Sequence, residues 1–130
     1  MKEKTNMTML CDFYELTMGN GYFQTGLKDR ICYFDVFYRS VPDSGGFSLA
    51  AGLAQVVEYI QELRFDEDDI AYLRTKGCFA EEFLDYLRHF KFTGDIWAVP
   101  EGTPIFPREP FLTVRAPAIQ AQFIETFLLL

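Results

Sequence analysis

The last third of the chain constrains the fold most, because it combines short β-type runs with closely spaced prolines. Every proline except Pro42 falls between residues 100 and 117. Proline has no backbone N–H, so a strand that contains it is confined to a sheet edge or a turn. The segment therefore predicts short strands at edges and turns, over residues 95–99, 103–106 and 111–116.

The segments before residue 94 predict helices with strands between them. Asp66 followed by Asp69 is typical of a capping box, and Gly77 suits the end of the helix that this box begins. The other expected helices are residues 9–23, 52–63 and 80–90, and the expected strands are 31–38 and 47–51. The first helix has an apolar face, formed by Leu10, Phe13, Tyr14, Thr17 and Met18. In the helix over residues 80–90, the residues expected to face the core are Phe83, Leu84, Leu87 and Phe90. A chain of 130 residues suffices for one compact domain of this kind.

The final predicted helix, residues 118–130, lacks the features that normally end a helix. Pro117 suits its first turn, but no glycine, cap or basic residue closes it. Its side chains leave almost no polar face, through Ile119, Phe123, Ile124, Phe127, Leu128, Leu129 and Leu130. Because chain termini are normally solvated, we expect these residues to belong to the front part of a larger protein.

Charge and cysteine content narrow the class of protein. The formal net charge is −7 and the pI is near 4.6, which disfavours nucleic acid and anionic membranes as partners. There is no run of 18 apolar residues. The 3 cysteines form no CxxC pair and the chain has 1 histidine, so zinc-ligand spacing is absent and reduced cytoplasmic thiols are expected. Aromatic residues reach 17%, which suits a large core, an interface or an aromatic ligand site.

Individual residues give few signals of chemistry. Gly19-Asn20-Gly21 begins like a dinucleotide-binding loop but lacks the third glycine, so a turn at a helix end is favoured. His89 at a helix end is expected on the surface, compensating the helix dipole. Asp12 could be a helix cap with Tyr14 in the core, or both could serve a site. Arg39 follows a strand, where ligand-binding groups are common, although a surface arginine is equally compatible.

A series of short motifs resembles the start of nicotinate phosphoribosyltransferases. The first is DFYELTM over residues 12–18, followed by GYF at 21–23 and by FDVFYR at 34–39 ahead of a Pro/Gly loop. Further matches are AGL at 51–53, LRF at 63–65, FLDYL at 83–87, FTGD at 92–95, VPEGT at 99–103 and IET at 124–126. Each motif is weak alone, but their common order over nearly the whole chain is specific.

The resemblance implies an α+β fold, the barrel-sandwich or hammerhead-like N-terminal domain of a type II phosphoribosyltransferase. Residues 1–117 would form this domain, and residues 118–130 would start the helix leading into an α/β barrel that these residues do not include. The family transfers phosphoribosyl from phosphoribosyl diphosphate to nicotinate, with coupled ATP hydrolysis, and gives nicotinate mononucleotide in NAD biosynthesis. ATP and Mg²⁺ would be bound by the barrel, so the 130 residues alone are expected to be inactive.

The resemblance also implies substrate-binding roles for three residues, at an active site shared across a cytoplasmic homodimer. By position, Tyr14 would stack on the pyridine ring, with Asp12 beside it, orienting the helix end or a polar group of the substrate. Arg39 would reach the phosphoribosyl phosphates across the interface. Glu101 and Glu125 also match the family, and we assign them structural roles in a turn and on a helix face.

Two other classes of function fit parts of the sequence. A nicotinamide or quinolinate phosphoribosyltransferase would share the architecture, because substrate choice lies largely in the barrel. A stand-alone interaction module without catalytic activity would explain the size and the aromatic content. Such a module predicts a polar, capped C-terminus, which this chain lacks.

Overall fold

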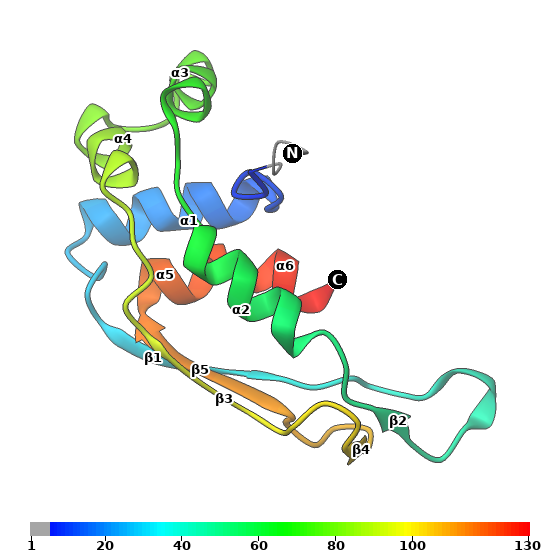
Figure 1. The fold of residues 1–130 in the computed structure, drawn as a ribbon. Helices are drawn as coiled ribbons and strands as arrows, with labels where there is room; N and C mark the ends of the chain where they lie inside the picture. The colour runs from blue at the N-terminus through cyan, green and yellow to red at the C-terminus, as the bar shows by residue number, and fades with distance from the viewer. Residues whose placement is uncertain (1–5) are drawn as a thin grey trace.

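The computed structural model describes residues 6–130 as a stack of helices on one side of a small sheet (Figure 1). The helices are α1 (Phe13–Gln24), α2 (Leu53–Glu62), α3 (Glu67–Thr75), α4 (Glu81–Arg88), α5 (Ala118–Phe123) and α6 (Glu125–Leu129), with a 3-10 turn, η1, at Pro42–Ser44. The strands are β1 (Ile31–Val36), β2 (Ser48–Leu49), β3 (Asp95–Ala98), β4 (Pro104–Ile105) and β5 (Leu112–Pro117). The α+β class expected from the sequence is confirmed.

The main sheet is antiparallel, with strand order β1-β5-β3. Val114 of β5 pairs with Phe34 on one side and with Ile96 on the other. The expectation that prolines confine all the late strands to edges is therefore wrong for β5, which is central. Its prolines, Pro110 and Pro117, lie before the strand and at its last residue, so its interior keeps its hydrogen-bond donors. Strands β2 and β4 form a separate two-stranded ribbon.

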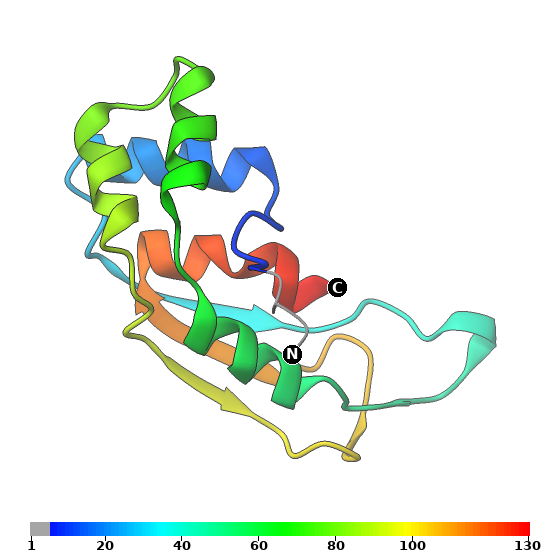
Figure 2. The same cartoon turned by 45° about the horizontal axis from the view of Figure 1, so that its top comes forward.

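Helix α5 lies directly on the main sheet, α1 packs on α5, and α4 packs on α1, so the core extends from the sheet into the helices (Figures 1 and 2). Alternate residues of β5 point into it, namely Leu112, Val114 and Ala116. Phe83 and Phe123 lie at the centre of a cluster of aromatic rings from several helices. The predicted inner face of α4 is confirmed, because Phe83, Leu84, Leu87 and Phe90 are all buried. The core thus accounts for part of the aromatic content, while Tyr33 and Trp97 remain exposed.

The first helix faces the opposite way from the sequence expectation. Its predicted apolar face is largely exposed, and the buried residues are Glu15, Leu16, Gly19 and Asn20. Gly19 and Gly21 lie inside α1, so this segment is neither a phosphate loop nor a helix-end turn. A Cβ at Gly19 would lie 2.6 Å from the Phe123 ring, because α5 crosses α1 at this point. Glycine therefore permits close packing here.

The capping box at the start of α3 is confirmed. Asp69 N–H donates to the Asp66 side chain at 2.9 Å, and Asp66 N–H donates to the Asp69 side chain at 3.0 Å. Two ion pairs hold α3 and α4 together, Arg74 with Glu81 and Arg88 with Glu67. These contacts join the two outer helices to each other.

The C-terminal segment forms two short helices instead of the single predicted one. The helix is interrupted at Ile124, and Pro117 is the N-cap of α5 rather than its first helical residue. Every residue of α5 is buried, including Phe123, whereas Leu129 and Leu130 are exposed. The break directs Thr126 N–H, near the start of α6, to the Glu15 carboxylate on α1. This donor would have no partner within its own helix, so Glu15 satisfies a helix N-terminus from another element.

Candidate functional site

Asp12 stands at the N-cap position of α1, but its carboxylate does not cap the helix. Its backbone is extended, with φ −70° and ψ 143°, and its side chain makes no capping hydrogen bond. The backbone N–H of Asp12 donates instead to Thr126 Oγ1 at 3.1 Å. The residue is exposed, so the fold fixes its backbone and leaves its carboxylate available to a ligand.

Tyr14 lies on the surface in the first turn of α1. Its side chain is 43% exposed, so the alternative that placed it in the core is wrong. The hydroxyl donates to Glu125 Oε1 at 2.7 Å. This bond to a carboxylate, more than burial, raises the pKa of Tyr14 to about 12. The phenol therefore stays neutral near pH 7, with its hydroxyl engaged and part of its ring facing outward.

Tyr14 belongs to an exposed apolar flank of α1, which comprises Phe13, Tyr14 and Met18. Phe13 also makes an edge contact with Phe79, at 5.9 Å between ring centroids. Contiguous exposed apolar side chains are uncommon on an isolated surface and typically mark a binding or docking surface. The flank gives the N-terminal turn of α1 the character expected of a site that receives a flat, apolar group.

Glu15 is the buried counterpart of this flank, and sequence reasoning missed it. Its Oε1 accepts from Thr126 N–H at 3.1 Å and also from Thr126 Oγ1, whereas Oε2 is buried without a hydrogen-bond partner. Burial raises the pKa of the Glu15 carboxyl, and the two Thr126 bonds offset this in part. The partner lies 111 positions away, so no local spacing could have indicated the pair.

Arg39 is exposed in the loop that leaves β1. The preceding residue, Tyr38, anchors that loop: its hydroxyl donates to Ile105 O at 2.6 Å, and its carbonyl accepts from Arg108 N–H at 2.8 Å. Within residues 6–130, the Arg39 guanidinium has no hydrogen bond or ion pair. Figures 1 and 2 both show the loop projecting beyond the sheet, away from the start of α1. The structure thus places Asp12 and Tyr14 together at the start of α1, and no hydrogen bond or ion pair within residues 6–130 joins Arg39 to either of them.

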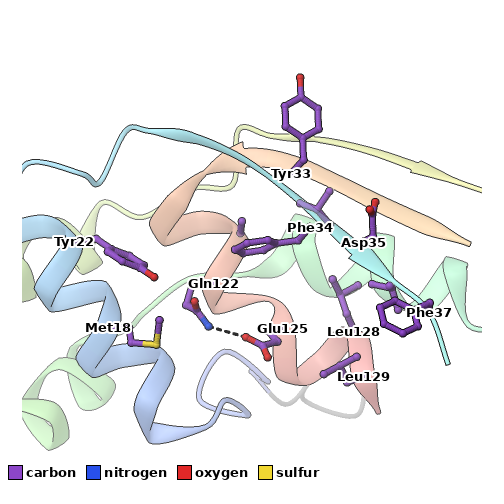
Figure 3. Close-up of a pocket in the computed structure, with 13 residues that line it drawn as sticks. Met18, Tyr22, Tyr33, Phe34, Asp35, Phe37, Gln122, Glu125, Leu128 and Leu129 are labelled. Carbon is purple, nitrogen blue, oxygen red and sulfur yellow. Dashed lines mark hydrogen bonds between the residues drawn. The ribbon is translucent and has the colours of Figure 1, made fainter. Parts of the chain in front are cut away.

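A cavity of about 640 Å³ lies between α1, β1 and the α5–α6 segment. Figure 3 shows Met18 and Tyr22 from α1 facing Phe34 from β1 across it. The polar groups at its wall include Gln122 and Glu125, joined by a hydrogen bond of 2.6 Å from Gln122 Nε2 to Glu125 Oε2. Glu125 therefore connects the cavity wall to the Tyr14 hydroxyl.

The remaining acidic and polar candidates serve the fold. Glu101 Oε1 accepts from Ala54 N–H at 3.0 Å in the first turn of α2, as its structural assignment predicted. His89 is exposed at the end of α4, with Nδ1 2.9 Å from Asp85 O. Cys11, Cys32 and Cys78 are free thiols, and burial raises the pKa of Cys11 to about 12.

The part of the chain that the structure describes contains no group of three or more His, Cys, Asp or Glu side chains placed to hold a metal ion. No helix among these residues is both long and apolar enough to span a bilayer.

Comparison with known proteins gives consistent matches. Residues 9–130 match the family model described as nicotinate phosphoribosyltransferase N-terminal domain. Nicotinate phosphoribosyltransferase pncB2 of Mycobacterium tuberculosis (strain H37Rv) is 46% identical over 121 residues, which are 93% of this chain and 26% of that protein. Nicotinate phosphoribosyltransferase of Bacillus subtilis (strain 168) is 34% identical over 124 residues, covering 95% of this chain and 25% of that protein.

The fold matches that of a solved structure. A crystal structure of human nicotinic acid phosphoribosyltransferase superimposes with a TM-score of 0.83 and 33% sequence identity. The match covers 91% of this chain and 24% of the human chain. The chain thus spans about a quarter of the length of the relatives it matches.

Proposed function

Because the chain belongs to the nicotinate phosphoribosyltransferase family, as its N-terminal domain, we propose that it contributes substrate-binding residues to an enzyme of that activity. The enzyme would transfer phosphoribosyl from phosphoribosyl diphosphate to the ring nitrogen of nicotinate, with coupled ATP hydrolysis. Its products would be nicotinate mononucleotide, a precursor in NAD biosynthesis, and diphosphate. The observation that carries the proposal is the match of residues 9–130 to the family's N-terminal domain.

In this proposal Tyr14 offers its ring face to the pyridine ring. The exposed ring and the engaged hydroxyl support this role, since stacking needs an accessible face held at a fixed angle. Asp12 lies two residues earlier, with a carboxylate that the helix does not use. It would orient the helix end or a polar group of the substrate. Positioning of this kind is a main source of rate in a transfer between two bound substrates.

Arg39 would bind phosphate oxygens of phosphoribosyl diphosphate. A guanidinium matches phosphate in a two-pronged geometry, and Arg39 has no competing partner among residues 6–130. Arg39 and Tyr14 are both exposed, and no hydrogen bond or ion pair joins them within residues 6–130. Their separation favours a site completed by other surfaces, and we propose a homodimer in which this domain serves the partner's barrel.

ATP and Mg²⁺ would bind outside these residues, on the barrel domain. Residues 6–130 provide no cluster of metal ligands that fits Mg²⁺, so no step through either group is assigned to this chain. The three free thiols suit a reducing compartment, and we propose a cytoplasmic location.

The test is product formation by the purified full-length enzyme that carries this domain. Nicotinate, nicotinamide and quinolinate are each supplied with phosphoribosyl diphosphate, Mg²⁺ and ATP, and the mononucleotide products are separated by chromatography. The proposal predicts nicotinate mononucleotide as the main product, with faster formation when ATP is present. Preference for nicotinamide or quinolinate would assign the enzyme to a related transferase, and absence of all three products would favour a non-catalytic module.

A further inference from the structure

Two consecutive residues at the start of α6 hold the substrate-facing turn of α1. Glu125 accepts a hydrogen bond from the Tyr14 hydroxyl, and Thr126 is hydrogen-bonded to both Asp12 and Glu15. The elements α1 and α6 are far apart in the sequence, so these bonds tie the two ends of the domain together. Three of the four residues from the N-cap Asp12 to Glu15 are thus hydrogen-bonded to the start of α6.

Glu125 is itself held firmly. Its second carboxylate oxygen accepts from Gln122 Nε2 at 2.6 Å, and Gln122 is 4% exposed within α5 (Figure 3). The Tyr14 hydroxyl therefore reaches an acceptor that is anchored to the buried layer of the domain. A tyrosine ring on a surface helix otherwise turns among rotamers, and fixing it before binding removes an entropic cost from the binding step.

The neighbouring contacts fix the backbone beneath the ring. Thr126 Oγ1 accepts from Asp12 N–H at 3.1 Å, and Thr126 N–H donates to buried Glu15 Oε1 at 3.1 Å. These bonds lock the first turn of α1, while the Glu125 bond locks the side chain of Tyr14. The backbone and the ring thus have separate hydrogen-bond partners, so a substitution at Glu125 can release the ring without removing the backbone bonds.

We propose that Glu125 is a positioning residue for recognition of the pyridine ring, acting through the Tyr14 hydroxyl. This inference rests on the proposed function of Tyr14 and extends it to a residue that sequence reasoning placed only on a helix face. The carboxylate touches no substrate atom in this account. It sets the angle of the ring face that the substrate meets.

The test compares steady-state constants of the full-length enzyme for both substrates. The variants are Glu125→Ala, Glu125→Gln, Tyr14→Phe and the Tyr14→Phe/Glu125→Ala pair. Glu81→Ala is the control, because Glu81 is a helix carboxylate that likewise accepts a side-chain hydrogen bond, from Arg74, at an exposed position. Thermal unfolding of every variant is measured in parallel.

Loss of a single positioning hydrogen bond predicts a KM for nicotinate that rises about 3- to 10-fold in Glu125→Ala. The KM for phosphoribosyl diphosphate should change less than about 2-fold, as expected when the interaction is remote from that substrate. Glu125→Gln keeps an acceptor for the hydroxyl and should restore most of the affinity. Tyr14→Phe should match Glu125→Ala, and the double variant should be no worse than either single variant.

Four outcomes would overturn the inference. If the rise in KM for nicotinate in the double variant equals the product of the two single-variant rises, Glu125 acts independently of the Tyr14 hydroxyl. Equal rises in both KM values, or a lower unfolding temperature alone as in Glu81→Ala, would reduce Glu125 to a structural residue. Tighter nicotinate binding in Glu125→Gln would mean that its charge, rather than its position, affects the substrate.

Failure of the proposed function has a different signature. A wild-type enzyme that does not turn over nicotinate would refute that function, whatever the variants do. The positioning of the ring is then measured in the 130-residue chain by NMR relaxation of ¹³C-labelled tyrosine. An ordered Tyr14 ring that becomes mobile in Glu125→Ala and stays ordered in Glu125→Gln is expected. A ring equally ordered or equally mobile in all three proteins would contradict the contact.

Discussion

Two glycines in α1, Gly19 and Gly21, allow a direct test of the packing that places the site. Both lie inside the same helix, so replacement of either by alanine should stabilise the helix by about 1 kcal/mol from propensity alone. At Gly21 a Cβ would meet nothing within 4 Å, and the full gain is expected. At Gly19 the added Cβ would lie 2.6 Å from Phe123 Cε1 and 2.8 Å from Cζ.

The Phe123 ring cannot move away easily. It lies among the rings of Phe65, Phe83 and Phe90, with centroid separations of 5.8, 6.5 and 5.5 Å. Overpacking a core of this kind costs about 1–3 kcal/mol. Subtracting the propensity gain leaves Gly19→Ala between neutral and about 2 kcal/mol destabilised, whereas Gly21→Ala is about 1 kcal/mol stabilised. The difference between the two variants isolates the packing cost.

The assay is urea unfolding of the 130-residue chain, followed by far-UV circular dichroism. The unfolding midpoint should rise for Gly21→Ala, and it should stay unchanged or fall for Gly19→Ala. Equal rises in both midpoints would refute the crossing of α5 over α1. The placement of Thr126 and Glu125 against Asp12 and Tyr14 would then lose its support.

The other predictions concern the site residues directly. Tyr14→Ala should weaken nicotinate binding about 10- to 100-fold, and Tyr14→Phe much less, because stacking and burial are worth roughly 1–3 kcal/mol. Calorimetry on the full-length enzyme measures both affinities. Equal losses of affinity in the two variants would assign the role to the hydroxyl. Arg39→Ala should raise the KM for phosphoribosyl diphosphate about 10-fold or more, with partial rescue by Arg39→Lys and little change for nicotinate. The 130-residue chain alone should form no nicotinate mononucleotide. Because the pKa of Glu15 is raised in the fold, ionisation of Glu15 lowers the free energy of unfolding as pH rises from its ordinary pKa of 4.5 to the raised value. In Glu15→Gln the urea midpoint should therefore depend less on pH over that range.

Features set by neighbouring residues could be predicted from the sequence. The Asp66–Asp69 capping box spans four consecutive positions, and its donors and acceptors are fixed by the helix start itself. The buried face of α4 could be predicted from the spacing of its apolar residues, because every residue at the expected positions is buried in the same core. In each case local spacing was sufficient.

Features set by distant partners could not be predicted from spacing. The inward face of α1 depends on Glu15 meeting Thr126, and the break at Ile124 serves the same contact. Spacing favoured the apolar residues of α1 as its core face, whereas the fold buries a carboxylate and leaves Tyr14 exposed. Asp12, Tyr14 and Arg39 were predicted as site residues from family motifs, whereas the hydrogen-bond partners of Asp12 and Tyr14 required the structure.

The central claim, that this domain supplies residues to an active site shared between subunits, is tested most directly by a mixed dimer. One subunit carries Arg39→Ala and the other has an inactivated barrel site. If Arg39 serves the partner's barrel, both defects fall in one of the two sites and the other is intact, so about half of the wild-type activity should return. If Arg39 serves its own barrel, each site carries one defect, and a mixed dimer that stays inactive would contradict the shared site.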